Sequence, residues 1–195
     1  MIKQIEFYFD FISPYAYLAH KKIVKLQQIK KIDFIYRPIL LGGLHNQLGI
    51  IAPGLIEIKK KFMIHDCKMV AKKFDINFKF NENFPINSLY LMRGLLTIES
   101  EKKFNYIDKF YEAYWAKNLE LKDQNTIKII LEDMGIDHKQ FLDDIELEKI
   151  KTKLKELTNL AEKKNIFGAP TFVANNKIFW GQDRLEYAID EALAT

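Results

Sequence analysis

The segment FDFISPYA (residues 9–16) combines a reactive type of side chain with a backbone that can support chemistry. Ser13 precedes Pro14, and proline is favoured at the first position of a helix, so the pair predicts a helix that begins here. The unpaired N–H groups of a helix start favour a nearby negative charge by roughly 0.3 to 1 kcal/mol. A thiolate placed there would be stabilised, and the Ser13 hydroxyl could donate a hydrogen bond to it. The simpler alternative is that Ser13 only caps its own helix.

A second candidate is Gly168-Ala169-Pro170-Thr171, where a proline enters a predicted strand. Such a proline lies either at the edge of a sheet or in a turn with a cis peptide bond. A cis bond would turn the backbone of Ala169 outward, where its N–H and C=O could pair with a peptide-like ligand. The alternative is an ordinary trans proline at a strand start, as most X–Pro bonds are.

A third candidate is WGQDRLE (residues 180–186), which ends a predicted hairpin and starts the last helix. Exposed N–H groups at this helix start could bind a carboxylate, and Asp183 could bind an ammonium group. Asp183 can also cap the helix, with Glu186 three residues later completing a capping box. The two roles are compatible.

Composition excludes other kinds of site. One cysteine, Cys67, excludes an intramolecular disulfide and any Cys-x-x-Cys redox or zinc motif. The four histidines have no ligand-like spacing, so we expect no metal. The net charge of +4 is dispersed over predicted helix faces, so we expect no nucleic-acid partner. Without a long apolar run or a signal-peptide pattern, we expect a cytoplasmic protein with no membrane partner.

The elements that position these segments lie at the two ends of the chain. Alternation of apolar and polar residues predicts a strand through Ile5, Phe7 and Phe9, a helix to about Ile29, and a strand over residues 32–37. Near the other end, two short strands flank Asn175-Asn176, which tolerates the positive φ of a tight hairpin, and a helix follows. The ends therefore have the order β-α-β and β-β-α, which is the plan of a thioredoxin-like fold.

Between these halves the pattern is helical throughout. Breaks are expected at Gly135 and Asp137-His138, and the predicted helices cover residues 56–74, 88–99, 104–115, 125–134 and 145–163. We therefore predict the α/β class, with a large all-helical insertion. Residues 1–41 and 166–195 would form the thioredoxin-like domain, and residues 42–165 the insertion domain.

Together these segments resemble one family. FYFDFISPYAYLA (residues 7–19) and FGAPTFVANNKIFWGQDRL (residues 167–185) are similar to segments of 2-hydroxychromene-2-carboxylate isomerases, which group with kappa-class glutathione transferases and, more distantly, DsbA-like oxidoreductases. APGLIEIKKKFMIHD resembles a kappa-class stretch, and FPINSLYLMRGL and FYEAYWAKNLEL are similar to segments across the group. The resemblance covers nearly the whole chain.

The resemblance implies that glutathione is the cofactor. Ser13 matches the serine that faces the glutathione sulfur, and Ala169-Pro170 matches the cis-proline pair whose backbone holds the cysteinyl part. Gln182 and Asp183 match positions that contact the γ-glutamyl end.

The glycyl end of glutathione is less well matched. Lys59 matches a lysine near the glycyl carboxylate, but the asparagine that kappa-class proteins place before this stretch is Ile50 here. Either a neighbouring group such as Asn46 substitutes for it, or glutathione binding is altered.

A substrate pocket is the expected role of Asn87 and Arg93, because the family likeness points to this segment and the spacing places both on one side of a helix. Arg93 is also one of only three arginines among 30 basic residues. It is therefore a candidate for a role that needs the several N–H donors of a planar guanidinium group. The alternative is that Arg93 ties the insertion to the core.

The favoured functional hypothesis is a glutathione-dependent isomerase, in which the thiolate adds reversibly to a small aromatic or unsaturated substrate. The alternatives are a kappa-class-like transferase that conjugates electrophiles and a non-catalytic glutathione binder. Thiol–disulfide exchange is excluded as the activity, because Ser13 and Ala16 occupy the positions at which an oxidoreductase has the two cysteines of its Cys-x-x-Cys motif. Since kappa-like proteins pair, a homodimer is also expected.

Overall fold

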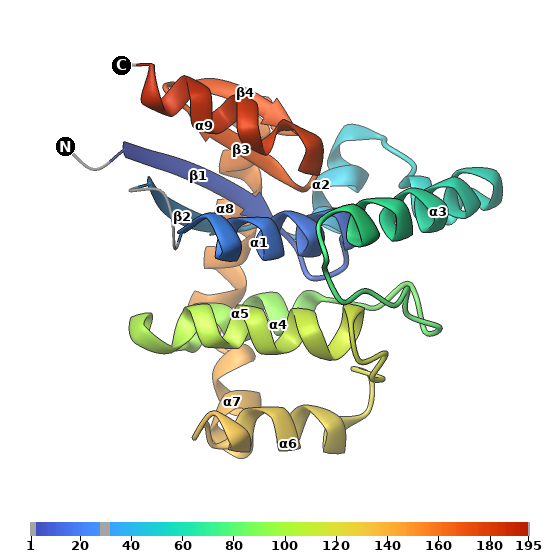
Figure 1. The fold of residues 1–195 in the computed structure, drawn as a ribbon. Helices are drawn as coiled ribbons and strands as arrows, with labels where there is room; N and C mark the ends of the chain where they lie inside the picture. Colours follow the sequence, from blue (N-terminus) through green and yellow to red (C-terminus); the bar gives the residue numbers. More distant parts are fainter. Residues whose placement is uncertain (1–2, 28–31, 195) are drawn as a thin grey trace.

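The computed structural model describes residues 3–27 and 32–194 (Figure 1). It has the predicted β-α-β opening and β-β-α ending, so the thioredoxin-like plan is confirmed. The elements of these halves are β1 (Lys3–Phe9), α1 (Pro14–Gln27), β2 (Ile32–Pro38), β3 (Thr171–Ala174), β4 (Lys177–Trp180), the 3₁₀ turn η2 (Gln182–Arg184) and α9 (Leu185–Leu193). The expected end of the first helix, near Ile29, lies outside the described residues.

The sheet has the strand order β2-β1-β3-β4. β1 pairs parallel with β2 and antiparallel with β3, and β3 pairs antiparallel with β4. Asn175 and Asn176 take φ angles of 48° and 62° in the hairpin, as their type predicts. Since Tyr8 lies opposite Thr171, the loop that follows β1 and the loop that precedes β3 meet at one end of the sheet.

The chain between β2 and β3, all of it described, contains helices and no strand. Figure 1 shows α4 and α5 beneath α1, with α6 and α7 farther from the sheet. These helices are α2 (Leu41–Leu48), η1 (Pro53–Leu55), α3 (Glu57–Lys73), α4 (Leu89–Thr97), α5 (Ser100–Trp115), α6 (Gln124–Asp133), α7 (His138–Ile145) and α8 (Glu148–Lys163).

Two helix starts differ from the prediction by three residues or more. α5 begins at Ser100 rather than at residue 104, and α8 begins at Glu148 rather than at residue 145. The expected break at Asp137-His138 separates α6 from α7, but α7 itself was not predicted. The Asp137 carboxylate accepts a hydrogen bond from the Gln140 N–H at 2.7 Å and caps that helix.

The expected capping box at Asp183 is wrong. The last helix starts at Leu185, after the 3₁₀ turn, and no side chain caps it. Asp183 lies instead within that turn, and its carboxylate pairs with the Arg184 guanidinium at 3.4 Å. The Asp183 carboxylate therefore does not cap the last helix.

The insertion and the sheet share one hydrophobic core among the described residues. The Phe7 ring stacks on Phe172 with centroids 5.4 Å apart, and the Phe9 ring lies 6.1 Å from that of Tyr111 on α5. Aromatic side chains of this size supply most of the buried apolar area of such a core. No described helix is long and apolar enough to cross a membrane.

Candidate active site

Ser13 occupies the junction where β1 ends and α1 begins. Its Oγ accepts a hydrogen bond from the Ala16 N–H at 3.1 Å, so Ser13 does cap the helix. The same hydroxyl donates to the Ala169 carbonyl oxygen at 2.9 Å. The Ala169-Pro170 bond is cis, as the resemblance implies. Ser13 and the cis-proline loop therefore form one unit, although 156 positions separate them in the chain.

The loop that carries Ser13 is held from within the core. Asp10 is fully buried, and its carboxylate accepts hydrogen bonds from the N–H groups of Ile12 at 3.1 Å and Leu41 at 2.7 Å. Burial raises the pKa of Asp10 above its ordinary value, and the hydrogen bonds to the carboxylate oppose this. The sequence offered a signal, an acidic residue at the end of a hydrophobic strand, that our prediction did not use.

The helical insertion supports the same loop. The Tyr111 hydroxyl donates to the Asp10 carbonyl oxygen at 3.2 Å, and the Trp115 indole donates to the Phe11 carbonyl oxygen at 2.9 Å. Because both donors belong to α5, the insertion fixes the backbone that positions Ser13.

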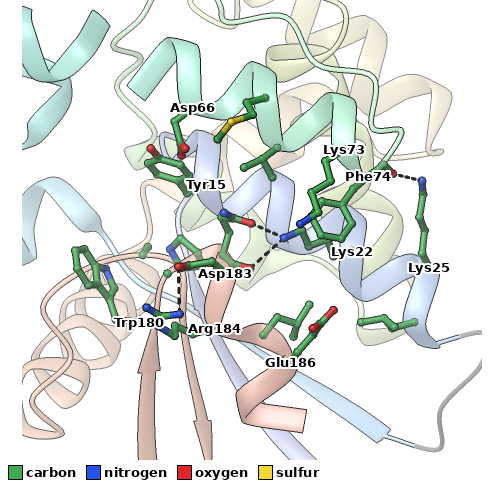
Figure 2. A pocket seen from close by; sticks show the side chains of 18 residues that line it. Tyr15, Lys22, Lys25, Asp66, Lys73, Phe74, Trp180, Asp183, Arg184 and Glu186 are labelled. Carbon is green, nitrogen blue, oxygen red and sulfur yellow. Dashed lines mark hydrogen bonds and ion pairs between the residues drawn. The ribbon is translucent and has the colours of Figure 1, made fainter. Parts of the chain in front are cut away.

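A groove of about 1000 Å³ opens beside this loop (Figure 2). Four of the five residues predicted to bind glutathione line it: Ala169, Pro170, Gln182 and Asp183. The volume is at the upper end of the range of small-molecule sites, roughly 300 to 1000 Å³. Ser13 does not line the groove itself, but its hydroxyl is hydrogen-bonded to Ala169, which does.

The turn at Gln182 and Asp183 is tied to the cis-proline loop. The Gly181 N–H donates to the Pro170 carbonyl oxygen at 2.9 Å. Gly181 has a φ of 109°, which favours glycine, and the Asp183 carboxylate lies close over it. Gln182 is buried and Asp183 is exposed, so the turn presents its carboxylate to solvent at the groove.

Trp180 forms one wall of the groove. Its ring lies 4.9 Å from that of Phe167. A Cβ atom at Gly168 would lie 2.6 Å from the Trp180 Nε1, so only glycine lets the indole lie against the backbone before the cis proline. Trp180 is 53% exposed and can report on ligands in the groove.

The opposite wall consists of α1 and α3 residues that our prediction missed. Figure 2 shows Tyr15 and Asp66 at one end, and Lys22, Lys73 and Phe74 at the other. Tyr15 and Lys22 lie two turns apart on one face of α1, a spacing that could have identified them. Burial raises the pKa of Tyr15, and the neighbouring Cys67 and Asp66 raise it further. The phenol therefore stays protonated at neutral pH.

Lys59 lies on exposed α3 surface and does not line the groove. It is seven residues before Asp66, two turns along the same helix face and roughly 10 Å away. Ile50 and Asn46 also lie outside the groove, at the end of α2. The structure therefore brings together the positions expected for the cysteinyl and γ-glutamyl parts of glutathione, but not those expected for the glycyl end.

Asn87 and Arg93 lie apart from the groove as well. The Asn87 side-chain oxygen accepts a hydrogen bond from the Leu89 N–H at 3.1 Å, just before α4. The Arg93 guanidinium pairs with Glu146 at 3.3 Å, which ties α4 to the turn between α7 and α8 inside the insertion. The other arginines pair similarly, Arg37 with Glu6 and Arg184 with Asp183.

The described part of the chain has no cluster of three or more His, Cys, Asp or Glu side chains arranged to hold a metal ion. Cys67 is a buried free thiol, and burial raises its pKa, with a smaller effect of Asp66. It is therefore a packed thiol and not a reactive one.

Comparisons with known proteins agree with this architecture. The chain is 28% identical over 189 residues to a 2-hydroxychromene-2-carboxylate isomerase of Sphingobium xenophagum, with 96% of each chain covered. It is 28% identical over 200 residues to glutathione S-transferase kappa 1 of Homo sapiens, with 94% of this chain and 88% of the relative covered. A solved structure of a 2-hydroxychromene-2-carboxylate isomerase superposes with a TM-score of 0.88 at 24% identity, covering 98% of this chain and 94% of the other.

A sequence profile of the DSBA-like thioredoxin domain matches residues 4–193, which is nearly the whole chain. The match includes both halves of the sheet and the entire helical insertion. This chain therefore belongs to the DSBA-like thioredoxin domain family.

Proposed function

We propose that this chain binds glutathione in the groove and acts as a glutathione-dependent isomerase of the 2-hydroxychromene-2-carboxylate isomerase type. The observation that carries the proposal is that one groove is lined by Ala169, Pro170, Gln182 and Asp183. The Ser13 hydroxyl is hydrogen-bonded to the first of these, Ala169. Relatives of that name at 28% identity over nearly full length support the choice of chemistry.

The residues present fit a γ-glutamyl tripeptide thiol. The groove has a peptide edge at Ala169-Pro170 and an exposed carboxylate at Asp183 that could bind an ammonium group. Bound glutathione would supply a thiol nucleophile whose addition to an unsaturated carbon permits bond rotation in the substrate, and breaking of the same C–S bond would then release the isomer and regenerate glutathione.

The chain's own contribution is to favour the thiolate and hold it in place. The positive end of the α1 dipole favours a negative charge near the start of the helix, and the Ser13 hydroxyl, which is hydrogen-bonded to Ala169, is a donor that could turn toward the sulfur. Trp180 and Tyr15 line the end of the groove next to this position.

The first test is binding. Glutathione at millimolar concentration should raise the melting temperature, because a ligand selective for the native state stabilises it. Absence of any shift up to saturating concentrations would count against the proposal and would point to Ile50, where related proteins have asparagine.

A glutathione transferase is the second candidate, because the human kappa-class relative is as similar to this chain as the isomerase is. It would use the same groove. Product analysis separates the two, since an isomerase leaves the amount of free glutathione unchanged and a transferase consumes it.

We also propose that the chain forms a homodimer and works in the cytoplasm, where its single cysteine stays reduced. Ile58 and Phe62 are 78% and 67% exposed and lie one turn apart on α3, and Leu55, 66% exposed, lies in the preceding turn η1. A sedimentation mass twice the 23.0 kDa of the chain is expected, and a mass near 23.0 kDa at micromolar concentration would exclude the dimer.

A further inference from the structure

The inner half of the groove has no role in the function proposed so far. Beyond Gln182 the groove continues between α1 and α3, past Phe74 to Lys22, Lys25 and Lys73 (Figure 2). Of these, Lys22 differs from the others because it is 9% exposed, whereas Lys25 and Lys73 are at the surface.

Lys22 is a buried cation whose partners are all uncharged. Its ammonium donates to the side-chain oxygen of Gln182 and to the Gln182 carbonyl oxygen at 3.3 Å, and lies 3.9 Å from the centre of the Phe74 ring. Among the described residues no carboxylate lies within ion-pair distance of it. A buried charge that lacks an opposite charge is costly, unless a ligand supplies one.

The charged groups that face Lys22 do not form an ion pair with it. Asp183 and Glu186 lie on the side of η2 and α9, and Lys73 on the side of α3. Asp183 is paired with Arg184, and Glu186 is exposed. Desolvation lowers the pKa of Lys22 to about 8, despite Glu186 and Asp183, so the side chain is still mostly protonated at neutral pH.

The shared bond with Gln182 indicates which anion would bind. The α-carboxylate and α-ammonium groups of a γ-glutamyl residue are attached to one carbon atom, so their partners in a site must be close neighbours. Gln182 and Asp183 are consecutive, and Lys22 is bonded to Gln182. The Asp183 carboxylate could bind the α-ammonium group of the ligand. The α-carboxylate of the ligand would then lie on the other side of Gln182, next to the Lys22 ammonium.

We propose that Lys22 binds the α-carboxylate of the γ-glutamyl residue and thereby selects thiols that carry this group. The inference rests on the proposed binding of glutathione in the groove. The sequence predicts no role for Lys22 in the site, and the proposed role belongs to the ammonium group that the fold brings to Gln182.

The test combines one variant with one change in the ligand. Lys22→Met keeps the length of the stem and removes the charge, and γ-aminobutyryl-cysteinyl-glycine is glutathione without the α-carboxylate. Calorimetry should show that Lys22→Met weakens glutathione binding roughly 10- to 100-fold, the usual loss of a charge-assisted hydrogen bond. Binding of γ-aminobutyryl-cysteinyl-glycine should be equally weak to both proteins.

Lys25→Met is the matched control. Lys25 lies on the same helix and lines the same groove, but its exposed ammonium donates to the carbonyl oxygens of Phe74 and Asp75 at 2.6 and 2.9 Å. Its loss should change glutathione binding by less than about threefold.

Two results would overturn the inference while the proposed function stands. One is unchanged glutathione binding by Lys22→Met, and the other is an equal loss for both ligands, which would mean that Lys22 only shapes the turn at Gln182. If Lys22→Met fails to fold, the wild-type protein still decides, since equal affinity for both ligands excludes recognition of the carboxylate. No binding of glutathione by the wild-type protein would overturn both the inference and the proposed function.

Discussion

The Ser13 hydroxyl donates its only hydrogen to the Ala169 carbonyl oxygen, across 2.9 Å. The bond holds the hydroxyl beside Ala169, whose backbone we propose to bind the cysteinyl part of glutathione. It also means that donation to a thiolate requires the hydroxyl to turn away from Ala169. The Ala169 carbonyl oxygen then becomes free to accept an N–H from the ligand, so the two changes compensate each other.

Ser13→Ala should raise the pKa of the glutathione thiol within the complex by roughly one to two units. The physical reason is that one charge-assisted hydrogen bond to the thiolate is lost, which is worth roughly 1.5 to 3 kcal/mol. Thiolate absorbance titrated in the complex measures this shift directly.

The same variant should lower the free energy of unfolding by about 1 kcal/mol, because the Ala16 N–H loses its cap. Binding of S-methyl glutathione, which has no thiolate, should barely change. If stability falls and the thiol titration stays where it was, Ser13 is a helix cap and no more.

Asp183→Asn should weaken glutathione binding roughly two- to fivefold, because an exposed ion pair with the α-ammonium group contributes little. The carboxylate is 57% exposed and already shared with Arg184. Glutaryl-cysteinyl-glycine, which lacks the α-ammonium group, should bind the variant and the wild-type protein equally. A loss of the same size for this ligand would show that Asp183 supports the turn and does not bind the amine.

The ends of the fold were predictable because their signals are local. Ser13-Pro14 marks a helix start, and Asn175-Asn176 marks a hairpin, whatever the rest of the chain does. Asp183 shows the limit of such signals. Its spacing to Glu186 fits a capping box, but Gly181 and the bond to Pro170 set a 3₁₀ turn that delays the helix to Leu185.

Arg93→Met and Glu146→Gln should both be mildly destabilising if the ion pair within the insertion is the whole role of Arg93, with Glu146→Gln also losing the ion pair to Lys151 at 3.0 Å. Each should lower the free energy of unfolding by up to about 1 kcal/mol, since the Glu146 partner is exposed. Neither should change glutathione affinity, because Arg93 does not line the groove. A fall in kcat/KM for the isomerase substrate in Arg93→Met alone would place Arg93 in the substrate pocket.

The least predictable features were those that depend on contacts between distant elements. Lys22 and Gln182 are 160 positions apart, and Asp10 meets the Leu41 N–H across 31 positions. In the sequence, Lys22 looks like an ordinary cation on a helix face, and only the packing of η2 against α1 buries it. Ala169, Pro170, Gln182 and Asp183, which the family motifs mark, line the groove, whereas Lys22 was missed because its burial depends on contacts between distant segments.

A buried polar network links α1, β2 and α5 and should make stability depend on pH. His20 is fully buried, with its Nδ1 2.7 Å from the Tyr36 hydroxyl and its Nε2 2.9 Å from Asp108, which also binds Lys21. Neighbouring hydrogen bonds and charges hold the pKa of Asp108 at about 2 against the effect of its burial, so it is ionised and can only accept. His20 therefore carries its hydrogen on Nε2 and accepts from Tyr36.

Burial lowers the pKa of His20 below its ordinary value, despite the opposing effect of Asp108. Protonation therefore favours the unfolded chain, whose histidine titrates near 6.5, so stability is full above about pH 7.5 and falls as the pH drops below 6.5. The wild-type protein should therefore lose stability from this group between pH 7.5 and 5.5, and His20→Gln should lack that part of the loss. Asp108 stays ionised throughout this window, and any effect of His45 is common to both proteins. Urea denaturation of each protein at the two pH values gives the difference, and equal losses would show that His20 does not control the pH dependence.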